Sequence, residues 1–450
     1  MRETRMFFLG LFLSTAASLL ALHLIVLEEE VEAPAVQRKV PTFPLWREQK
    51  LSEQTHCEWK VPKLVFTPPV YSPHTSPVGA AFTALGMTHS TDNQLQYGWH
   101  YSKIRDEAGL RIVENLVASD PFPKKLVNHI RHDENMHFKG FMCRKIKQFA
   151  KREPRRGPER CFDLSTFTLP AFYLGDDEHC QQFQAETTEG TGSGRWVSKP
   201  GTTGGHNSQG IIFWESRSQA AHRFGCNLDR KERDVLVQQL LPNPLLINGR
   251  FFDLRTYMLV INTNPAVVYF APGWARLSEI EVQKDEPLSN KHITTKHAPG
   301  AAVRGDDRRL DFEQLSDTIV QLKLGTHEQV AELFRQIKQK TMLAFLAAED
   351  ELSHNPGMFA LYGLDFFVDD TLRPWFNEIS HSPNYRLRQS KIIEAIVPSI
   401  LRDHFVLVAQ AKEQLACSNG TRFNAPRQFG LWSLLMNRAD QIPFYSPMCD

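Results

Sequence analysis

Short strands alternate with helical segments through the second half of this 450-residue chain. Apolar residues at helical spacing predict a helix over 326–349, and a second over 391–410 that Pro398 bends or breaks. Runs rich in β-branched and aromatic residues predict strands at 195–199, 211–215, 234–241, 254–262, 266–270, 361–368 and 375–380. Strands with interleaved helices predict an α/β fold with mixed (α+β) sheets.

The N-terminus carries an apolar segment, residues 6–27, without Lys, Arg, Asp or Glu. As a helix it would be about 33 Å long, which matches the core of a bilayer. Arg2 and Arg5 precede it and glutamates follow it. We therefore expect residues 1–27 to form a signal anchor or transmembrane helix, although Ala16-Ala17-Ser18 also fits a cleavage site. The charge asymmetry predicts that the rest of the chain lies on the lumenal side.

Net charge selects no class of partner, because 52 Lys and Arg nearly balance 51 Asp and Glu. A basic stretch at 144–160 fits either a docking site for an acidic protein tail or a solvated helix end. It lacks interleaved aromatic residues and any nucleic-acid-binding motif, so no nucleic-acid partner is expected.

Two acids stand on the predicted hairpin at 361–380. If Val368 faces Trp375, then Asp365 faces Glu378, and two opposed carboxylates destabilise a sheet unless a cation offsets them. Mg²⁺ is such a cation, and Ser380 on the same face as Glu378 offers a further oxygen. Two separate surface acids are the alternative interpretation.

A glycine-rich turn at 201–210 follows Lys199. Glycines let backbone amides approach a phosphate, and the lysine supplies a charge, but a loose hairpin loop has the same composition. Asp253 and Arg255 share one face of a strand, where they either bind a ligand or form a salt bridge.

The order of these segments resembles the tubulin–tyrosine-ligase-like family of the ATP-grasp superfamily over residues 95–410. GRWVSKPGTTGGHNSQGI is similar to the family's lysine-proline strand and phosphate loop, and LVQQLLPNPLLINGRFFDLRTYMLVI to its adenine hinge and "GRKFDLR" strand. APGWARLSEI and LSNKHITT resemble the segments that follow, and GLDFFVDDTLRPWFNEISHSP resembles the metal-binding hairpin. Upstream, VNHIRHDENMHFKGFMCRKIKQF and FDLSTFTLP resemble "NHFPG…K" and "FPxTxxLP".

The resemblance implies an ATP-grasp fold, and the apolar segment 6–27 adds an N-terminal membrane anchor to it. We accordingly expect a stem or linker over 28–80, the N-terminal part of the ligase-like domain over 81–190, the ATP-grasp core over 191–410 and a C-terminal tail over 411–450.

It also implies ATP and Mg²⁺ as cofactors, and an amide bond formed between a free amino acid and a protein carboxylate through an acyl phosphate. The implied cofactor-binding residues are Lys199, Gln238, Gln239, Leu240 and Leu241. The implied metal ligands are Asp365, Glu378 and Ser380, and the implied catalytic residues are Arg255, Arg276, Asp253 and Asn290.

Three positions depart from the family pattern. Gln239 replaces the hinge lysine, Phe251 replaces a phosphate-facing lysine and Ser380 replaces a metal-binding asparagine. Loss of a charge-assisted contact typically costs about 1.5–3 kcal/mol. The alternative to the ligase is therefore a catalytically degraded, membrane-tethered pseudoenzyme that binds nucleotide or protein.

The protein that accepts the amino acid depends on the side of the membrane on which the folded domain lies. The family resemblance implies a cytosolic protein with an acidic tail, such as tubulin, whereas the charge rule predicts a lumenal domain. A secretory-pathway acceptor is then a third interpretation, and the glycosylation triplet Asn419-Gly420-Thr421 fits it. In a lumenal domain, Cys161 with Cys180 and Cys417 with Cys449 are candidate disulfide pairs.

Overall fold

The protein is described from a computed structural model, and its chain divides into two compact units, residues 1–54 and 55–450. The described residues all lie in the second unit: 60, 64–66, 77–90, 98–100, 125–152, 164–188, 194–202, 210–283, 289, 293–294, 308–381, 383 and 390–440. The predicted anchor, 1–27, lies outside them. Among the described helices, none combines the length and apolarity needed to cross a membrane.

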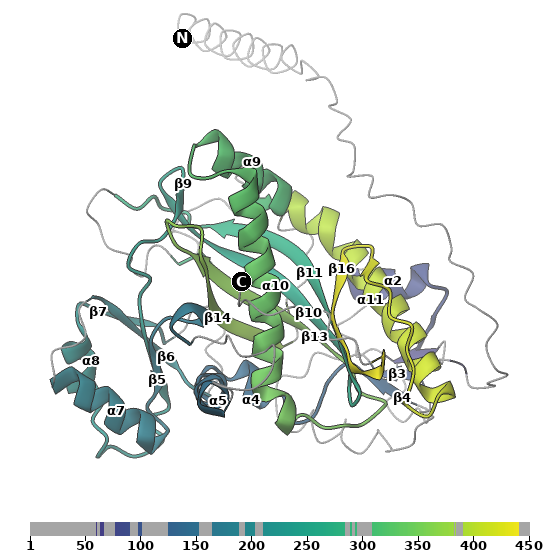
Figure 1. Ribbon diagram of the computed structural model, residues 1–450, viewed down its shortest axis with the longest axis horizontal. Coiled ribbons are helices and arrows are strands. Elements are labelled where there is room, and N and C mark those ends of the chain that lie inside the picture. Colours follow the sequence, from purple (N-terminus) through teal and green to yellow (C-terminus); the bar gives the residue numbers. More distant parts are fainter. Residues whose placement is uncertain are drawn as a thin grey trace, which may run out of the picture. The chain divides into compact units, whose positions relative to one another are not determined.

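A large antiparallel sheet forms the centre of the second unit (Figure 1). Its strand order is β14-β13-β10-β11-β16-β15, and the short strands β9 and β12 pair with β10 and β11. The strands are β9 (Leu246–Ile247), β10 (Arg250–Thr263), β11 (Ala266–Leu277), β12 (Arg309–Asp311), β13 (Ala360–Val368), β14 (Pro374–His381), β15 (Gln428–Phe429) and β16 (Trp432–Asn437). The predicted hairpins at 254–270 and 361–380 are both present in this sheet.

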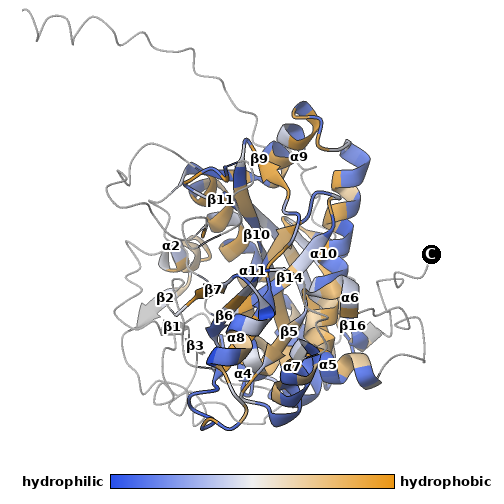
Figure 2. Ribbon diagram, turned by 90° about the vertical axis from the view of Figure 1, so that its left-hand side faces the viewer, coloured by the Kyte–Doolittle hydropathy of each residue, from blue (hydrophilic) through white to orange (hydrophobic). Residues whose placement is uncertain are grey.

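Each face of the large sheet packs against its own helices. Leu254, Met258 and Val260 of β10 lie in one apolar cluster with α10 (His327–Ala348) and α9 (Phe312–Gln321). Tyr257, Leu259 and Ile261 lie in another with α11 (Lys391–Cys417) and α2 (Pro77–Ala84). Residues of β10 therefore alternate between two cores, as strand geometry requires, and the helices turn apolar stripes toward the sheet (Figure 2).

A second, four-stranded sheet has the order β5-β8-β6-β7. Its strands are β5 (Ala171–Tyr173), β6 (Trp196–Pro200), β7 (Ile212–Trp214) and β8 (Val235–Gln239). Helices α7 (Asp177–Thr188) and α8 (Arg217–Arg223) pack on one face through Phe172, Trp196 and Val237. Helix α5 (Lys139–Arg152) packs on the other face, where Cys143 meets Tyr173 and Leu236.

A third sheet has the order β2-β1-β3-β4, with all its strands parallel. It comprises β1 (Leu64–Phe66), β2 (Thr88–Ser90), β3 (Gly98–His100) and β4 (Lys125–Val127). The short helices α4 (Glu134–His137) and α6 (Leu164–Phe167) and the 3₁₀ turns η3 (Glu349–Glu351) and η5 (Arg438–Asp440) complete the described elements. Strand β1 and the start of α2 lie within the segment predicted as a stem, 28–80, and the rest of that segment, Lys60 excepted, is outside the described residues.

Helix α11 differs from the predicted helix at 391–410. It runs without a break through Pro398 and ends at Cys417. Proline leaves the carbonyl four residues earlier without its helical donor. That residue, Glu394, and Pro398 are both exposed, so water can satisfy the carbonyl. Beyond α11 the chain adds β15 and β16 to the large sheet, although 411–450 was predicted as a tail.

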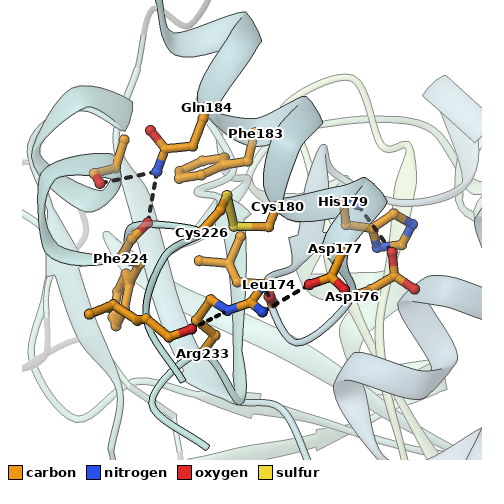
Figure 3. Close-up of a disulfide and its surroundings, with 12 residues drawn as sticks. Leu174, Asp176, Asp177, His179, Cys180, Phe183, Gln184, Phe224, Cys226 and Arg233 are labelled. Atoms are coloured by element: carbon orange, nitrogen blue, oxygen red, sulfur yellow. Dashed lines mark hydrogen bonds and ion pairs between the residues drawn. A yellow bond between two sulfur atoms is a disulfide. The ribbon is translucent and has the colours of Figure 1, made fainter. Parts of the chain in front are cut away.

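A disulfide joins Cys180 of α7 to Cys226, just after α8 (Figure 3). The predicted pair Cys161/Cys180 is therefore wrong, because α7 and α8 pack together on the small sheet and bring Cys226 to Cys180. Cys417 is also disulfide-bonded. Cys449 lies outside the described residues, so the pair Cys417/Cys449 stays a prediction.

Candidate active site

The two acids of the β13–β14 hairpin do face each other, as the sequence predicts, but not for the predicted reason. Val368 pairs with Pro374 rather than Trp375. A β-bulge between Asp365 and Phe366 then adds Asn377 to β14, which restores the pairing of Asp365 with Glu378. The bulge therefore brings three oxygen-bearing side chains to the site from two strands.

Two arginines hold Asp365. The Arg255 guanidinium donates two hydrogen bonds, Nε to Oδ1 at 2.5 Å and Nη2 to Oδ2 at 3.0 Å. Arg276 donates from Nη2 to Asp365 Oδ2 at 2.8 Å and binds both oxygens of Asp253 at 2.7 and 2.6 Å. Burial alone would raise the pKa of Asp365, but the two guanidiniums hold it well below its usual range.

The ion pairs form a charged row in the order Arg255, Asp365, Arg276 and Asp253, with Asp253 at one end. Burial raises its pKa, an effect that Arg276 opposes. The Thr294 hydroxyl also donates to Asp253 Oδ2 at 2.9 Å. Asp253 and Arg255 occupy the face of β10 that carries Tyr257 farther along, so the charged row continues an apolar core face.

Gly363 makes room for the Arg255 guanidinium. A Cβ on Gly363 would lie 2.8 Å from Arg255 Nη1 and 3.2 Å from Pro383 Cβ. A side chain at this position would therefore displace the arginine or the strand.

Lys139, the first residue of α5, reaches Glu378 with Nζ 2.9 Å from Oε2. Glu378 raises the pKa of Lys139 and, against the effect of burial, Lys139 lowers the pKa of Glu378. Both groups therefore stay charged at neutral pH.

Lys199 enters the same space from β6 of the small sheet. Its Nζ donates to Gln238 Oε1 at 2.9 Å and to Asn377 Oδ1 at 2.8 Å. Both of these partners are neutral amides, and burial lowers the pKa of Lys199 to about 8, although Glu378 opposes this. The Lys199 ammonium thus links the two sheets. Its charge is offset by the nearby carboxylate of Glu378 and not by a carboxylate in direct contact.

The predicted adenine hinge, Gln238 to Leu241, overlaps the end of β8. The backbone N–H groups of Gln239 and Leu240 donate to Pro170 O and Arg195 O, each at 2.8 Å, while the Gln238 side chain points to Lys199. Leu241 is buried and Leu240 partly buried. Gln238 therefore lies beside the lysine, and the two amide donors bind neighbouring chain segments.

The remaining predicted site residues divide into three cases. Phe251 is buried, with its ring 5.5 Å from that of Phe367, so it packs as an apolar residue. Ser380 pairs with Gly363 and lies on the Asp365 and Glu378 face. Asn290 is outside the described residues.

The donor set fits Mg²⁺. Within the described residues no group of three or more His, Cys, Asp or Glu side chains is arranged to hold a metal. Mg²⁺ typically takes one or two carboxylates and completes its octahedron with phosphate and water. Asp365 and Glu378 are ionised and adjacent, which meets that requirement.

The site carries a surplus of positive charge. Its cations are Lys139, Lys199, Arg255 and Arg276, and its carboxylates are Asp253, Asp365 and Glu378. The cations therefore exceed the carboxylates by one formal charge. A bound anion such as a phosphate could accept hydrogen bonds from these cations, and the carboxylates of Asp365 and Glu378 would then be free to bind a metal ion.

Sequence reasoning missed two of these residues. Lys139 lies in the VNHIRHDENMHFKGF segment, whose family resemblance was noted without assigning the lysine a role. Asn377 comes directly before Glu378 in the sequence. It is the extra residue of the β-bulge, and its side chain accepts a hydrogen bond from Lys199.

Comparison with known proteins identifies a solved structure with a similar fold and the family of this chain. The solved C-terminal domain of Kluyveromyces lactis Pby1, an ATP-grasp enzyme, matches with a TM-score of 0.54 and 16% identity, covering 83% of this chain and 98% of that chain. At this identity the match concerns the fold alone, which is the ATP-grasp fold with mixed sheets.

The model of the tubulin-tyrosine ligase family matches residues 117–415, and the chain belongs to this family. "Protein polyglycylase TTLL10" of Macaca fascicularis is 25% identical over 266 residues, which are 54% of this chain and 42% of that protein. "Inactive polyglycylase TTLL10" of Homo sapiens is 24% identical over 274 residues, 56% of this chain and 40% of that protein. The chain thus spans less than half the length of these relatives.

Proposed function

We propose that this chain is an ATP- and Mg²⁺-dependent ligase that joins a free amino acid to a protein carboxylate. The observation that carries the proposal is the meeting of Lys199 with the Asp365/Glu378 hairpin, through the 2.8 Å bond from Lys199 Nζ to Asn377 Oδ1. A phosphate-binding cation and a pair of hard carboxylate ligands then lie at one place between two sheets.

The charged residues that the sequence predicted for the site each have a task in this proposal. Lys199 binds the nucleotide phosphates, with the segment from Gln238 to Leu241, including Gln239 and Leu240, along the adenine. Asp365 and Glu378, with Ser380, hold Mg²⁺, which neutralises phosphate charge when bound. Arg255 and Arg276 stabilise the charge of the transferring phosphoryl group, and Asp253 and Asn290 bind the amino acid.

The reaction has two steps. An acceptor carboxylate oxygen attacks the γ-phosphorus, the bond from that phosphorus to the ADP oxygen breaks, and an acyl phosphate forms. The amine of the amino acid then attacks the acyl carbon, loses a proton and expels inorganic phosphate. Both steps depend on positioning and charge neutralisation, which the surplus of cations supplies.

The relatives bear on the donor and the activity. Two similar proteins carry the same polyglycylase name, one of them described as inactive. Glycine is therefore the first amino acid to test, with glutamate and tyrosine beside it, and a protein with an acidic tail is the first acceptor. In this proposal, residues 1–27 anchor the chain, 28–80 lead to the ligase domain over 81–190 and 191–410, and β15 and β16 complete the sheet.

A nucleotide-binding pseudoenzyme is the second candidate, and one observation favours it. Phe251 packs against Phe367 where the family pattern has a phosphate-facing lysine. Such a protein would bind nucleotide, if at all, without releasing ADP in the presence of any acceptor.

The deciding experiment is calorimetric titration of ATP into the full-length chain, with and without Mg²⁺, for the native protein and Glu378→Gln. The Glu378 side chain is 23% exposed and bonded to one lysine, so this isosteric change should leave the fold intact. We expect ATP binding that needs Mg²⁺ and is lost in the variant. Glu332→Gln, on the exposed face of α10, is the matched control.

Magnesium-independent binding, or no binding by the folded protein, would contradict the proposed site and favour the pseudoenzyme. Mg²⁺-dependent binding should then be followed by measurement of ADP release with candidate acceptors and each amino acid. Persistent absence of release, with binding intact, would leave the pseudoenzyme.

A further inference from the structure

Three disulfide-bonded cysteines outside the candidate site indicate an oxidising environment. Cys180 is fully buried and bonded to Cys226 on the α7–α8 face of the small sheet (Figure 3). Cys417, the last residue of α11, is also disulfide-bonded. Structural disulfides form and persist in secretory and extracellular compartments and are rare in the cytosol.

The described free thiol is protected. Cys143 is buried between α5 and the small sheet, and burial raises its pKa to about 11. Cysteine reactivity follows the thiolate, so this thiol can survive beside the disulfides without being oxidised.

The glycosylation triplet lies on an exposed turn directly after Cys417. Asn419 is exposed, and its side-chain amide makes no hydrogen bond within the described part of the chain. A Cβ on Gly420 would meet nothing within 4 Å, so the space beside the turn is open. Thr421 Oγ1 donates to Ser418 O at 2.7 Å, which holds the triplet at the end of the helix.

We propose that this domain folds in an oxidising, lumenal compartment and that Asn419 accepts an N-linked glycan there. The disulfide at Cys180 and the disulfide-bonded Cys417 both favour an oxidising compartment, and the open turn at Asn419 is accessible to glycosylation there. The apolar segment at 6–27, followed by acidic residues, has the charge pattern that sends the downstream chain there.

The two modifications are N-glycosylation of Asn419 and formation of the disulfide between Cys180 and Cys226. Asn419 Nδ2 attacks C1 of a lipid-diphosphate-linked oligosaccharide, a C–N bond forms, the C1–O bond to the diphosphate breaks, and the amide gives up one proton. Cys180 and Cys226 lose two protons and two electrons as their S–S bond forms, and an oxidised dithiol carrier protein of the compartment takes the electrons.

The compartment restricts the acceptor, a consequence that rests on the proposed ligase function. The acceptor would be a lumenal or extracellular protein with a reachable carboxylate, and tubulin would be excluded by location. The glycan and the disulfides themselves require no ligase activity, so their tests succeed or fail independently of it.

The experiment expresses the full-length chain in cultured animal cells and treats it with peptide N-glycosidase. We expect a mobility shift on electrophoresis for the native chain and Thr421→Ser, and no shift for Asn419→Gln or Thr421→Ala. Asn424→Gln, an exposed asparagine outside any triplet, is the matched control and should shift normally. Thr421→Ser keeps both the acceptor sequence and the hydroxyl that closes the turn.

Alkylation and mass spectrometry of the same folded protein give the second measurement. We expect a cross-linked peptide pair that contains Cys180 and Cys226, separated only after reduction. An unmodified Asn419 in the folded native chain would overturn the glycosylation site. Free thiols at Cys180 and Cys226 in the folded chain would overturn the oxidising compartment.

Discussion

Arg255 grips Asp365 through two parallel hydrogen bonds across neighbouring strands, and both side chains are almost fully buried. Planar bidentate pairing of this kind fixes both groups in one geometry. Asp365 therefore supports the sheet as well as being a candidate metal ligand, which makes it a poor choice for testing metal binding alone.

Replacing Asp365 with Asn should destabilise the protein strongly. The variant removes the carboxylate that pairs with the buried Arg255 guanidinium and leaves Arg276 paired with Asp253 alone. Breaking a buried ion pair costs about 3–5 kcal/mol. Urea denaturation of the full chain measures the change. Glu332→Gln, which breaks the exposed bidentate pair with Arg335, should cost about 0–1 kcal/mol. Equal costs for the two variants would show that burial of the Asp365 pair adds nothing.

Gly363→Ala should destabilise by about 1–3 kcal/mol, because the added methyl overpacks the space that the Arg255 guanidinium fills. The same denaturation experiment applies. In the background of Arg255→Lys, which removes the Nη1 atom that the methyl meets, the cost should fall clearly. An unchanged cost in the double variant would mean that the methyl meets something other than the guanidinium.

ATP binding should weaken as the pH rises through the pKa of Lys199, which burial lowers to about 8. The lysine is mostly charged at pH 7 and mostly neutral at pH 9, so affinity should fall about tenfold across that range if only the charged form binds phosphate. Calorimetric titration at several pH values measures this.

Lys199→Arg supplies the control for the pH series, because arginine stays charged throughout the range. Its ATP affinity should be flat between pH 7 and pH 9. A native profile without a decline above pH 8 would remove Lys199 from the phosphate site.

Loss of the disulfide should lower stability. Cys180→Ser with Cys226→Ser opens a bridge across a sequence separation of 46 residues, and loss of a bridge typically costs about 2–4 kcal/mol. Denaturation without reductant gives the difference. Reductant should then lower the stability of the native protein more than that of the double variant; an equal response would contradict a formed bridge.

Sequence alone located the strands of the site because each carries a strong apolar pattern bounded by turns. It paired Asp365 with Glu378 from an assumed contact between Val368 and Trp375. The assumed contact was one residue out of register, and the bulge at Asn377 compensated. Strand periodicity carries no sign of a bulge, so the correct pair depended on two offsetting differences.

The contacts between elements were beyond the reach of sequence patterns. Lys139 reaches Glu378 from a helix more than two hundred positions upstream, and Cys180 meets Cys226 because two helices pack on one sheet. Local sequence propensity predicts neither contact, because both depend on how separate helices and strands pack together. The same limit applies to Pro398, where solvent exposure of one helix face decided that α11 continues.

The bulge in β14 also has a consequence for how the length of this hairpin can vary. Asp365 and Phe366 are consecutive, whereas their partners Glu378 and Phe376 are separated by Asn377. Asn377 is therefore a surplus residue that pairing does not use. A chain without it would keep both acids opposed and lose the amide that reaches Lys199, so this single extra residue adds a direct side-chain link between the hairpin and the neighbouring sheet.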